Sequence, residues 1–194
     1  MGETDESPVG LGQAVSTDEG HQLVDKVKQQ SSPDGKIALN TDPKNLNWTG
    51  ASAYDVEGTL VVTVPLKNEG TQWSNLTVAL NQDQEIENYT EAHFYELSDT
   101  SGRVTVYQDG ELTTDRVSEA KEEPVRVTTF GLRDAVGELN SCLSAAGIPA
   151  WVVAGATAAC SAFGGWAGLL ACYTASGVAG GTVGYCAGKA AKKL

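Results

Sequence analysis

The sequence predicts an α+β fold: a short N-terminal helix and a small antiparallel β-meander, followed by a C-terminal disulfide-linked all-α helical hairpin. Apolar residues change from helical to strand spacing at about residue 52, and Asp109-Gly110 is a strong hairpin signal. No residue between 139 and 188 carries a formal charge, and all four cysteines lie in that stretch. The chain therefore divides into two parts of different character.

We place the boundaries of these parts from composition. Residues 1–15 are polar and Gly-rich and are expected to be disordered. Residues 16–130 form the acidic β-rich part, a pro-domain or carrier domain. Residues 131–194 form the apolar Gly/Ala-rich helical module with four cysteines.

The first helix is predicted from a capping pattern. Ser16-x-x-Glu19 resembles a capping box, and Leu23, Val24 and Val27 form one apolar stripe that ends by Gln30. The sequence Ser-Ser-Pro-Asp-Gly at 31–35 is typical of a turn. A short amphipathic helix is expected here.

The strands are predicted from β-branched and aromatic residues between turn signals. Pro65 ends the first run, and Asp109-Gly110 joins two later runs as a hairpin. The predicted strands cover residues 59–64, 75–80, 92–97, 103–107, 111–114 and 125–129. Short loops between them favour an antiparallel meander.

Helical spacing returns after Gly131. A lead-in helix is predicted to about Ala146, and Gly147 and Pro149 suit a helix stop and a new start. A second helix is predicted over 149–163 and a third over 166–193, with Gly164-Gly165 as the turn between them. These two helices form the predicted hairpin.

The charge is divided unevenly along the chain. Residues 1–138 hold all 25 acidic residues and ten basic residues, a charge of −15 (10 − 25), whereas residues 139–194 hold three lysines, a charge of +3. An acidic surface repels nucleic acid, so a nucleic-acid partner is not expected. While it is attached, the acidic part would offset the attraction of the three lysines to an anionic membrane.

Aromatic residues in the apolar part have a spacing close to the thickness of a membrane. Trp151 and Trp166 are about 22 Å apart along a helix, and Trp166 and Tyr185 about 28 Å, against roughly 30 Å for a hydrocarbon core. Trp and Tyr favour the membrane interface, and lysines interact with anionic lipid. The predicted interface residues are Trp151, Trp166, Tyr185, Lys189, Lys192 and Lys193.

Glycines at four-residue spacing predict close helix packing. Glycine disfavours a free-standing helix by about 1 kcal/mol relative to alanine, but it lets two backbones touch in lipid or in a tight bundle. The predicted packing residues are Gly177, Gly180, Gly181, Gly184 and Gly188. Membrane-active packing, a compact soluble disulfide-linked bundle and a permanent membrane anchor all fit this pattern.

The four cysteines favour two disulfides over a metal site or free buried thiols, because no Cys-x-x-Cys pair occurs. In a hairpin that reverses at Gly164-Gly165, Cys160 and Cys172 are offset by about 4.5 Å and can be bridged. Cys142 and Cys186 then pair by elimination if a break near 177–181 shortens the third helix. Four cysteines allow three pairings, so the connectivity stays open.

The chain contains no recognised catalytic, cofactor or metal motif. Gly-x-Ser-x-Gly, the phosphate loop, the dinucleotide fingerprint and His-Glu-x-x-His are all missing. His93 lies between Glu91 and Glu96 in a predicted strand and is most simply a surface or half-buried strand residue. We expect a protein that is not an enzyme and needs no cofactor.

The layout of an acidic β-rich half followed by a Cys-containing Gly/Ala-rich peptide, Asn140–Leu194, resembles precursors of halocin-type and related secreted bacteriocins. The resemblance implies secretion and cleavage by a processing protease near residues 119–140. It also implies release of an antimicrobial C-terminal peptide that acts on the membrane of target cells. The N-terminal part would then mask the peptide or confer immunity.

Two other functions are compatible with the same residues. A surface β module could be held by a C-terminal membrane hairpin, as a structural or binding protein associated with the membrane. A soluble secreted interaction domain could use its apolar tail to complete its own core. Proteolytic release of a free C-terminal fragment distinguishes the precursor from both alternatives.

Overall fold

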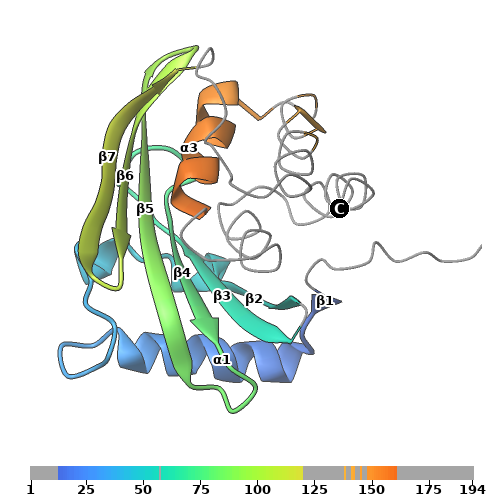
Figure 1. The fold of residues 1–194 in the computed structure, drawn as a ribbon. Helices are drawn as coiled ribbons and strands as arrows, with labels where there is room; N and C mark the ends of the chain where they lie inside the picture. Colours follow the sequence, from blue (N-terminus) through green and yellow to red (C-terminus); the bar gives the residue numbers. More distant parts are fainter. Residues whose placement is uncertain are drawn as a thin grey trace, which may run out of the picture.

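The computed structural model describes residues 13–56, 58–119 and 148–160 and, individually, residues 138, 141, 142 and 145. Within these residues, each strand pairs antiparallel with the next strand in the chain, which forms one seven-stranded meander (Figure 1). The strands are β1 (Gln13–Ala14), β2 (Ser52–Val56), β3 (Thr59–Pro65), β4 (Asn75–Leu80), β5 (Ile86–Ser98), β6 (Ser101–Gln108) and β7 (Glu111–Glu119).

Helix α1 (Thr17–Gln30) begins as the capping pattern predicts. The side chain of Ser16 accepts a hydrogen bond from the backbone N–H of Glu19 at 3.3 Å. Two short 3₁₀ helices, Pro43–Asn45 and Trp48–Gly50, shape the connection to β2. Helix α3 (Ala150–Cys160) lies near the C-terminal end of the described residues.

Successive residues of a strand point to opposite faces of the sheet, so the sheet has two different surfaces. On one face, α1 inserts Leu23 and Val27 against alternate apolar residues of β3 and β4. The strand residues of this cluster are Leu60, Val62, Val64, Leu76, Val78 and Leu80. This cluster is the core that holds α1 on the meander.

Helix α3 packs on the other face. It contacts β5, β6 and β7, whereas α1 contacts β2 and β3 (Figure 1). Phe94 and Val104 are cross-strand partners whose side chains lie on the α3 side, and both are fully buried. The same face continues across β3 and β4, where Val61, Thr77 and Ala79 are buried as well.

The predicted fold class is wrong in its C-terminal half. No separate disulfide-linked all-α hairpin is seen in the described residues; they show mainly an antiparallel sheet with two short helices. The predicted helix over 149–163 corresponds to α3, but α3 packs on the sheet instead of on a second helix. An apolar pattern predicts that a helix is covered, but it does not identify the surface that covers it.

The meander itself agrees with the predicted one. Strand β4 has the predicted bounds, and Asp109 and Gly110 both have positive φ in the turn between β6 and β7. Strand β5 begins six residues earlier than predicted, because polar residues such as Asn88 and Thr90 also pair with β4. The predicted strand over 125–129 lies outside the described residues.

Candidate functional site

Trp151, near the start of α3, fills a socket in the sheet. Its side chain is 1 % exposed, and its ring lies 6.5 Å from that of Phe94 between centroids. A methyl group at Gly102 of β6 would overlap the indole ring, so the socket exists only because residue 102 has no side chain. The hydroxyl of Ser118 donates a hydrogen bond to the Trp151 carbonyl oxygen at 3.1 Å.

A second glycine brings the helix backbone close to the sheet. A Cβ atom at Gly155 would lie 2.5 Å from Cγ2 of Val104 and 3.3 Å from the ring of Phe94. The predicted role of glycine, close approach of a backbone to its neighbour, therefore occurs in α3 at a helix–sheet contact. Glycines at 102 and 155 together allow α3 to lie flat on β5–β7.

The indole N–H of Trp151 is buried and has no hydrogen-bond partner in the described part of the chain. An unpaired buried donor costs about 1–3 kcal/mol, because the group loses water and gains no partner. Within the described residues, the socket therefore suits the apolar body of the ring and provides no hydrogen-bond partner for its N–H group. An interface between lipid and water satisfies both parts of the ring.

Several residues of the predicted sites are placed by the structure. Cys160 is the last residue of α3, and Cys142, which is disulfide-bonded, has helical conformation. Trp151 is covered by the sheet, so a role at a membrane interface requires α3 to leave its socket. The other predicted residues lie outside the described ones: Cys172, Cys186, Trp166, Gly177, Gly180, Gly181, Gly184, Tyr185, Gly188, Lys189, Lys192 and Lys193.

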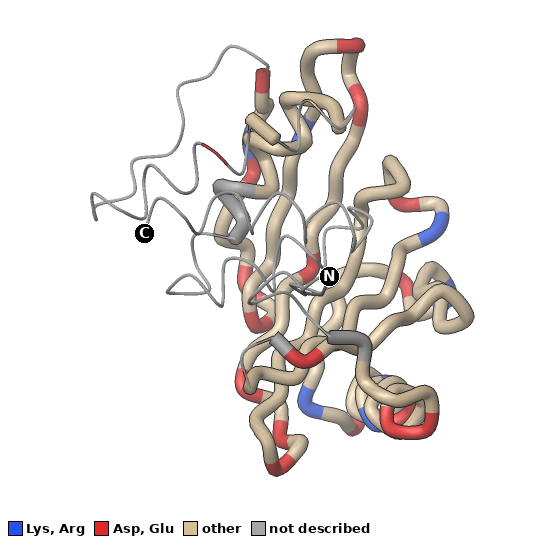
Figure 2. The backbone as a smooth tube through the Cα atoms, turned by 90° about the vertical axis from the view of Figure 1, so that its right-hand side faces the viewer, with Lys and Arg blue, Asp and Glu red and all other residues tan. Residues whose placement is uncertain are grey.

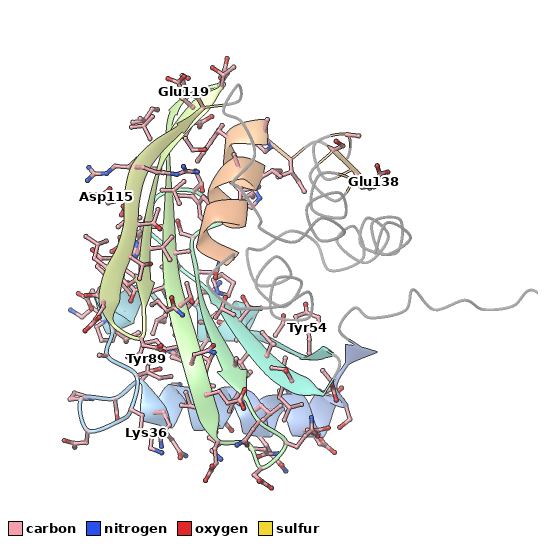
Figure 3. The ribbon with its side chains drawn as sticks, viewed as in Figure 1. Lys36, Tyr54, Tyr89, Asp115, Glu119 and Glu138 are labelled. Carbon is pink, nitrogen blue, oxygen red and sulfur yellow. The ribbon has the colours of Figure 1, made fainter. Side chains whose placement is uncertain are left out.

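A polar pocket lies on the face of the sheet opposite α3. It has a volume of about 560 Å³, and its walls include Glu69, His93, Tyr95, Arg103, Tyr107 and Asp115. Asp115 is labelled in Figure 3, where it projects from β7 on the side away from α3.

His93 forms the floor of this pocket together with a buried carboxylate. Nε2 of His93 lies 2.7 Å from Oε1 of Glu91, and the two residues are 5 % and 1 % exposed. The other oxygen of Glu91 accepts a hydrogen bond from the backbone N–H of Asn40 at 2.9 Å. The expectation of a surface or half-buried histidine is therefore wrong, because the loop around residue 40 covers this strand.

Glu69 reaches the pocket from the loop between β3 and β4. Burial alone would raise the pKa of its carboxyl group, but hydrogen bonds from Thr41, Tyr95 and Asn45 and the charge of His93 outweigh that effect. The pKa of Glu69 is therefore lowered from its ordinary value of 4.5. Its Oε2 atom lies 3.5 Å from Nδ1 of His93.

An ion pair forms the outer wall of the pocket. Arg103 donates two hydrogen bonds to the two oxygens of Asp115, at 2.8 and 2.7 Å. The hydrogen bond from Arg103 lowers the pKa of Asp115, and the bond to Asp115 raises that of Arg103. Both groups are solvent-exposed, so the pair orients Arg103 more than it stabilises the fold.

Sequence reasoning missed this pocket for two reasons. Glu91, His93 and Tyr95 alternate along β5 and therefore share a face, a signal that the sequence does contain. Glu69 and Asn40 come from loops that no local pattern places beside β5. The pocket depends on how two loops cross the sheet.

Two further properties hold for the part of the chain that the structure describes. It has no group of three His, Cys, Asp or Glu side chains arranged to hold a metal ion. Helix α3, with 11 residues, is its most apolar helix, and no helix in this part has the length and hydrophobicity needed to cross a bilayer.

Comparison of the chain with known proteins gives no match to a protein-family model, to a curated protein or to a solved structure.

Replacing Gly102 with alanine is expected to destabilise the protein by about 1–3 kcal/mol, because the new methyl group overlaps the Trp151 ring. Urea unfolding measures this change. Combining Gly102→Ala with Trp151→Phe should cost less than the sum of the two single changes, since the smaller ring leaves room for the methyl group. Strict additivity of the two would show that Trp151 does not occupy this socket.

Glu69→Gln tests the ionisation of the pocket through pH. The folded-state pKa of Glu69 lies below 4.5, so its carboxylate contributes stability that is fully present above 4.5 and is lost as the pH falls through the folded-state value. The difference in unfolding free energy between wild type and variant should be constant at neutral pH and shrink below pH 4.5. Urea midpoints measured across this range check the prediction, and parallel pH profiles would contradict it.

Proposed function

We propose that the chain is the precursor of a secreted, membrane-active antimicrobial peptide of the bacteriocin or halocin kind. Its acidic sheet covers the apolar C-terminal segment until proteolysis releases that segment to act on target membranes. The observation that carries this proposal is the burial of Trp151 in a socket on the sheet. Helix α3 of the apolar segment is thereby held against the acidic part.

The contacts of α3 with the sheet are compatible with reversible packing. Tight packing at Gly102 and Gly155 holds the helix, while the indole N–H of Trp151 has no hydrogen-bond partner among the described residues, which favours its departure. A headgroup region offers that N–H a partner and the ring an apolar surface. Sheet and membrane thus compete for the same side chain.

Charge supports the same division of roles. The acidic positions of the described residues are spread over α1, the turns and the strand ends, and Lys and Arg positions are fewer (Figure 2). A sequence charge of −15 before residue 139 and +3 after it means that the attached acidic part weakens attraction to anionic lipid. Separation of the two parts restores that attraction.

The connection between β7 and α3 is long enough to contain a protease site. Strand β7 ends at the exposed Glu119, and α3 begins at Ala150, so 30 residues (149 − 119) join them. A cut between residues 119 and 138, before the disulfide-bonded Cys142, removes the covalent link but leaves the contacts of α3 with β5–β7. We therefore expect cleavage to permit release and the membrane to complete it.

Vesicle leakage tests the proposal. A chain with a specific protease site inserted between residues 119 and 138 is added to anionic vesicles before and after cleavage. The intact chain should cause little leakage and the cleaved chain should cause much more. Gly102→Ala should increase the rate of leakage caused by the cleaved chain, because the added methyl group weakens the packing of Trp151 against β6.

The control is Glu85→Gln, an exposed change in the turn before β5, which should leave leakage unchanged. Equal leakage with intact and cleaved chains would contradict masking of the apolar segment by the sheet. Inactivity of both chains would contradict a membrane-active segment. A full-length chain that stays in the membrane fraction of its own cells would favour the alternative, a surface β module with a membrane anchor.

A further inference from the structure

The pocket on the face opposite α3 is not used by the proposed function. Besides its polar walls, it includes Leu97 and Leu112, whose side chains are 59 % and 56 % exposed. Large exposed apolar residues beside convergent polar groups are a common feature of binding sites. The chemistry of the walls indicates what such a site would accept.

The pocket has an excess of negative charge. Its lining includes the carboxylates of Glu69 and Asp115 and one guanidinium, that of Arg103, which is already bound to Asp115. Glu91 adds a third carboxylate directly beneath His93. Glu69 is held ionised by three hydrogen-bond donors, which also fix its position. A cation is therefore favoured over an anion.

His93 lies between two carboxylates at this pocket. Its Nε2 atom is 2.7 Å from Oε1 of Glu91, and its Nδ1 atom is 3.5 Å from Oε2 of Glu69. The side chain of Glu91 is 1 % exposed and that of Glu69 is 23 % exposed, so Glu69 is the one of the two that a ligand in the pocket can reach. A positively charged ligand with several donors on one atom would suit this carboxylate.

Aromatic rings complete the site. Tyr95 stacks on His93 with centroids 6.2 Å apart, and Tyr107 meets His93 edge-on at 6.0 Å. Tyrosine faces attract cations, and leucine side chains cover an alkyl stem. A primary ammonium group combines positive charge with three donors on one nitrogen.

We propose that this pocket binds a primary alkylammonium group, such as a lysine side chain or an aliphatic diamine. The ammonium lies against the carboxylate of Glu69 and beside the ring of Tyr95, and its alkyl stem leaves past Leu97 and Leu112. This inference is independent of the proposed precursor function, since it concerns the other face of the sheet.

Binding is tested on the full chain by NMR titration, with the ring signals of Tyr95 and Tyr107 as the readout. The probes are Nα-acetyl-lysine methylamide, its Nε-acetylated form and cadaverine. The lysine probe should cause saturable shifts, whereas the acetylated probe has the same stem without charge and should cause none. Saturable binding of cadaverine as well would assign the site to alkylammonium ions in general, and its failure would assign the site to lysine side chains.

Glu69→Gln should weaken binding of the lysine probe about tenfold, because a charge-assisted hydrogen bond is lost. Glu85→Gln removes a carboxylate outside the pocket and serves as the matched control. A second variant, Tyr95→Phe, keeps the ring but removes the hydrogen bond to Glu69, so it should weaken binding by a smaller factor.

Three results would overturn the proposal: shifts that do not saturate, equal binding of the acetylated and free lysine probes, and equal weakening by Glu69→Gln and Glu85→Gln. Urea midpoints of each variant show whether it is folded. Tyr95→Phe provides the decisive comparison if Glu69→Gln does not fold, and unchanged binding by Tyr95→Phe would then overturn the proposal.

Discussion

The contact between Trp151 and Gly102 joins the two unlike parts of this chain. Gly102 belongs to the acidic, β-rich part, and Trp151 belongs to the apolar part. The contact requires a residue without a side chain on β6 and a large ring on α3, and it is supported by Gly155 against Val104. Because shape and not charge determines this fit, it tolerates little change on either side.

The alternation of side chains along a strand lets one sheet support two sites. On β5, the side chain of Phe94 lies on the face that packs against α3. Its neighbours His93 and Tyr95 line the pocket on the opposite face. On β6, Gly102 makes room for Trp151, and the next residue, Arg103, forms the ion pair with Asp115. The two sites thus share a backbone but no side chains, so each can be altered while the other stays intact.

Prediction from the sequence succeeded for features that are determined by neighbouring residues in the chain. The serine cap of α1, the bounds of β4 and the Asp109-Gly110 turn each depend on a few adjacent residues. It failed for the fold class, because an uncharged segment rich in Gly and Ala can be covered by lipid, by other helices or by a sheet. The contacts of Trp151 with Gly102 and of Gly155 with Val104 show that the sheet covers α3. The cluster at Glu69 was missed for a related reason, since two loops far apart in sequence bring it together.

The central claim is that the sheet and the membrane compete for Trp151. A variant with Trp48, Trp73 and Trp166 replaced by phenylalanine makes Trp151 the sole source of indole fluorescence. Its quenching by anionic vesicles with brominated acyl chains is measured before and after cleavage between residues 119 and 138. If the sheet and the membrane compete for Trp151, its emission is not quenched in the intact chain and is strongly quenched after cleavage. Emission that is quenched equally in both states, or in neither, would contradict it.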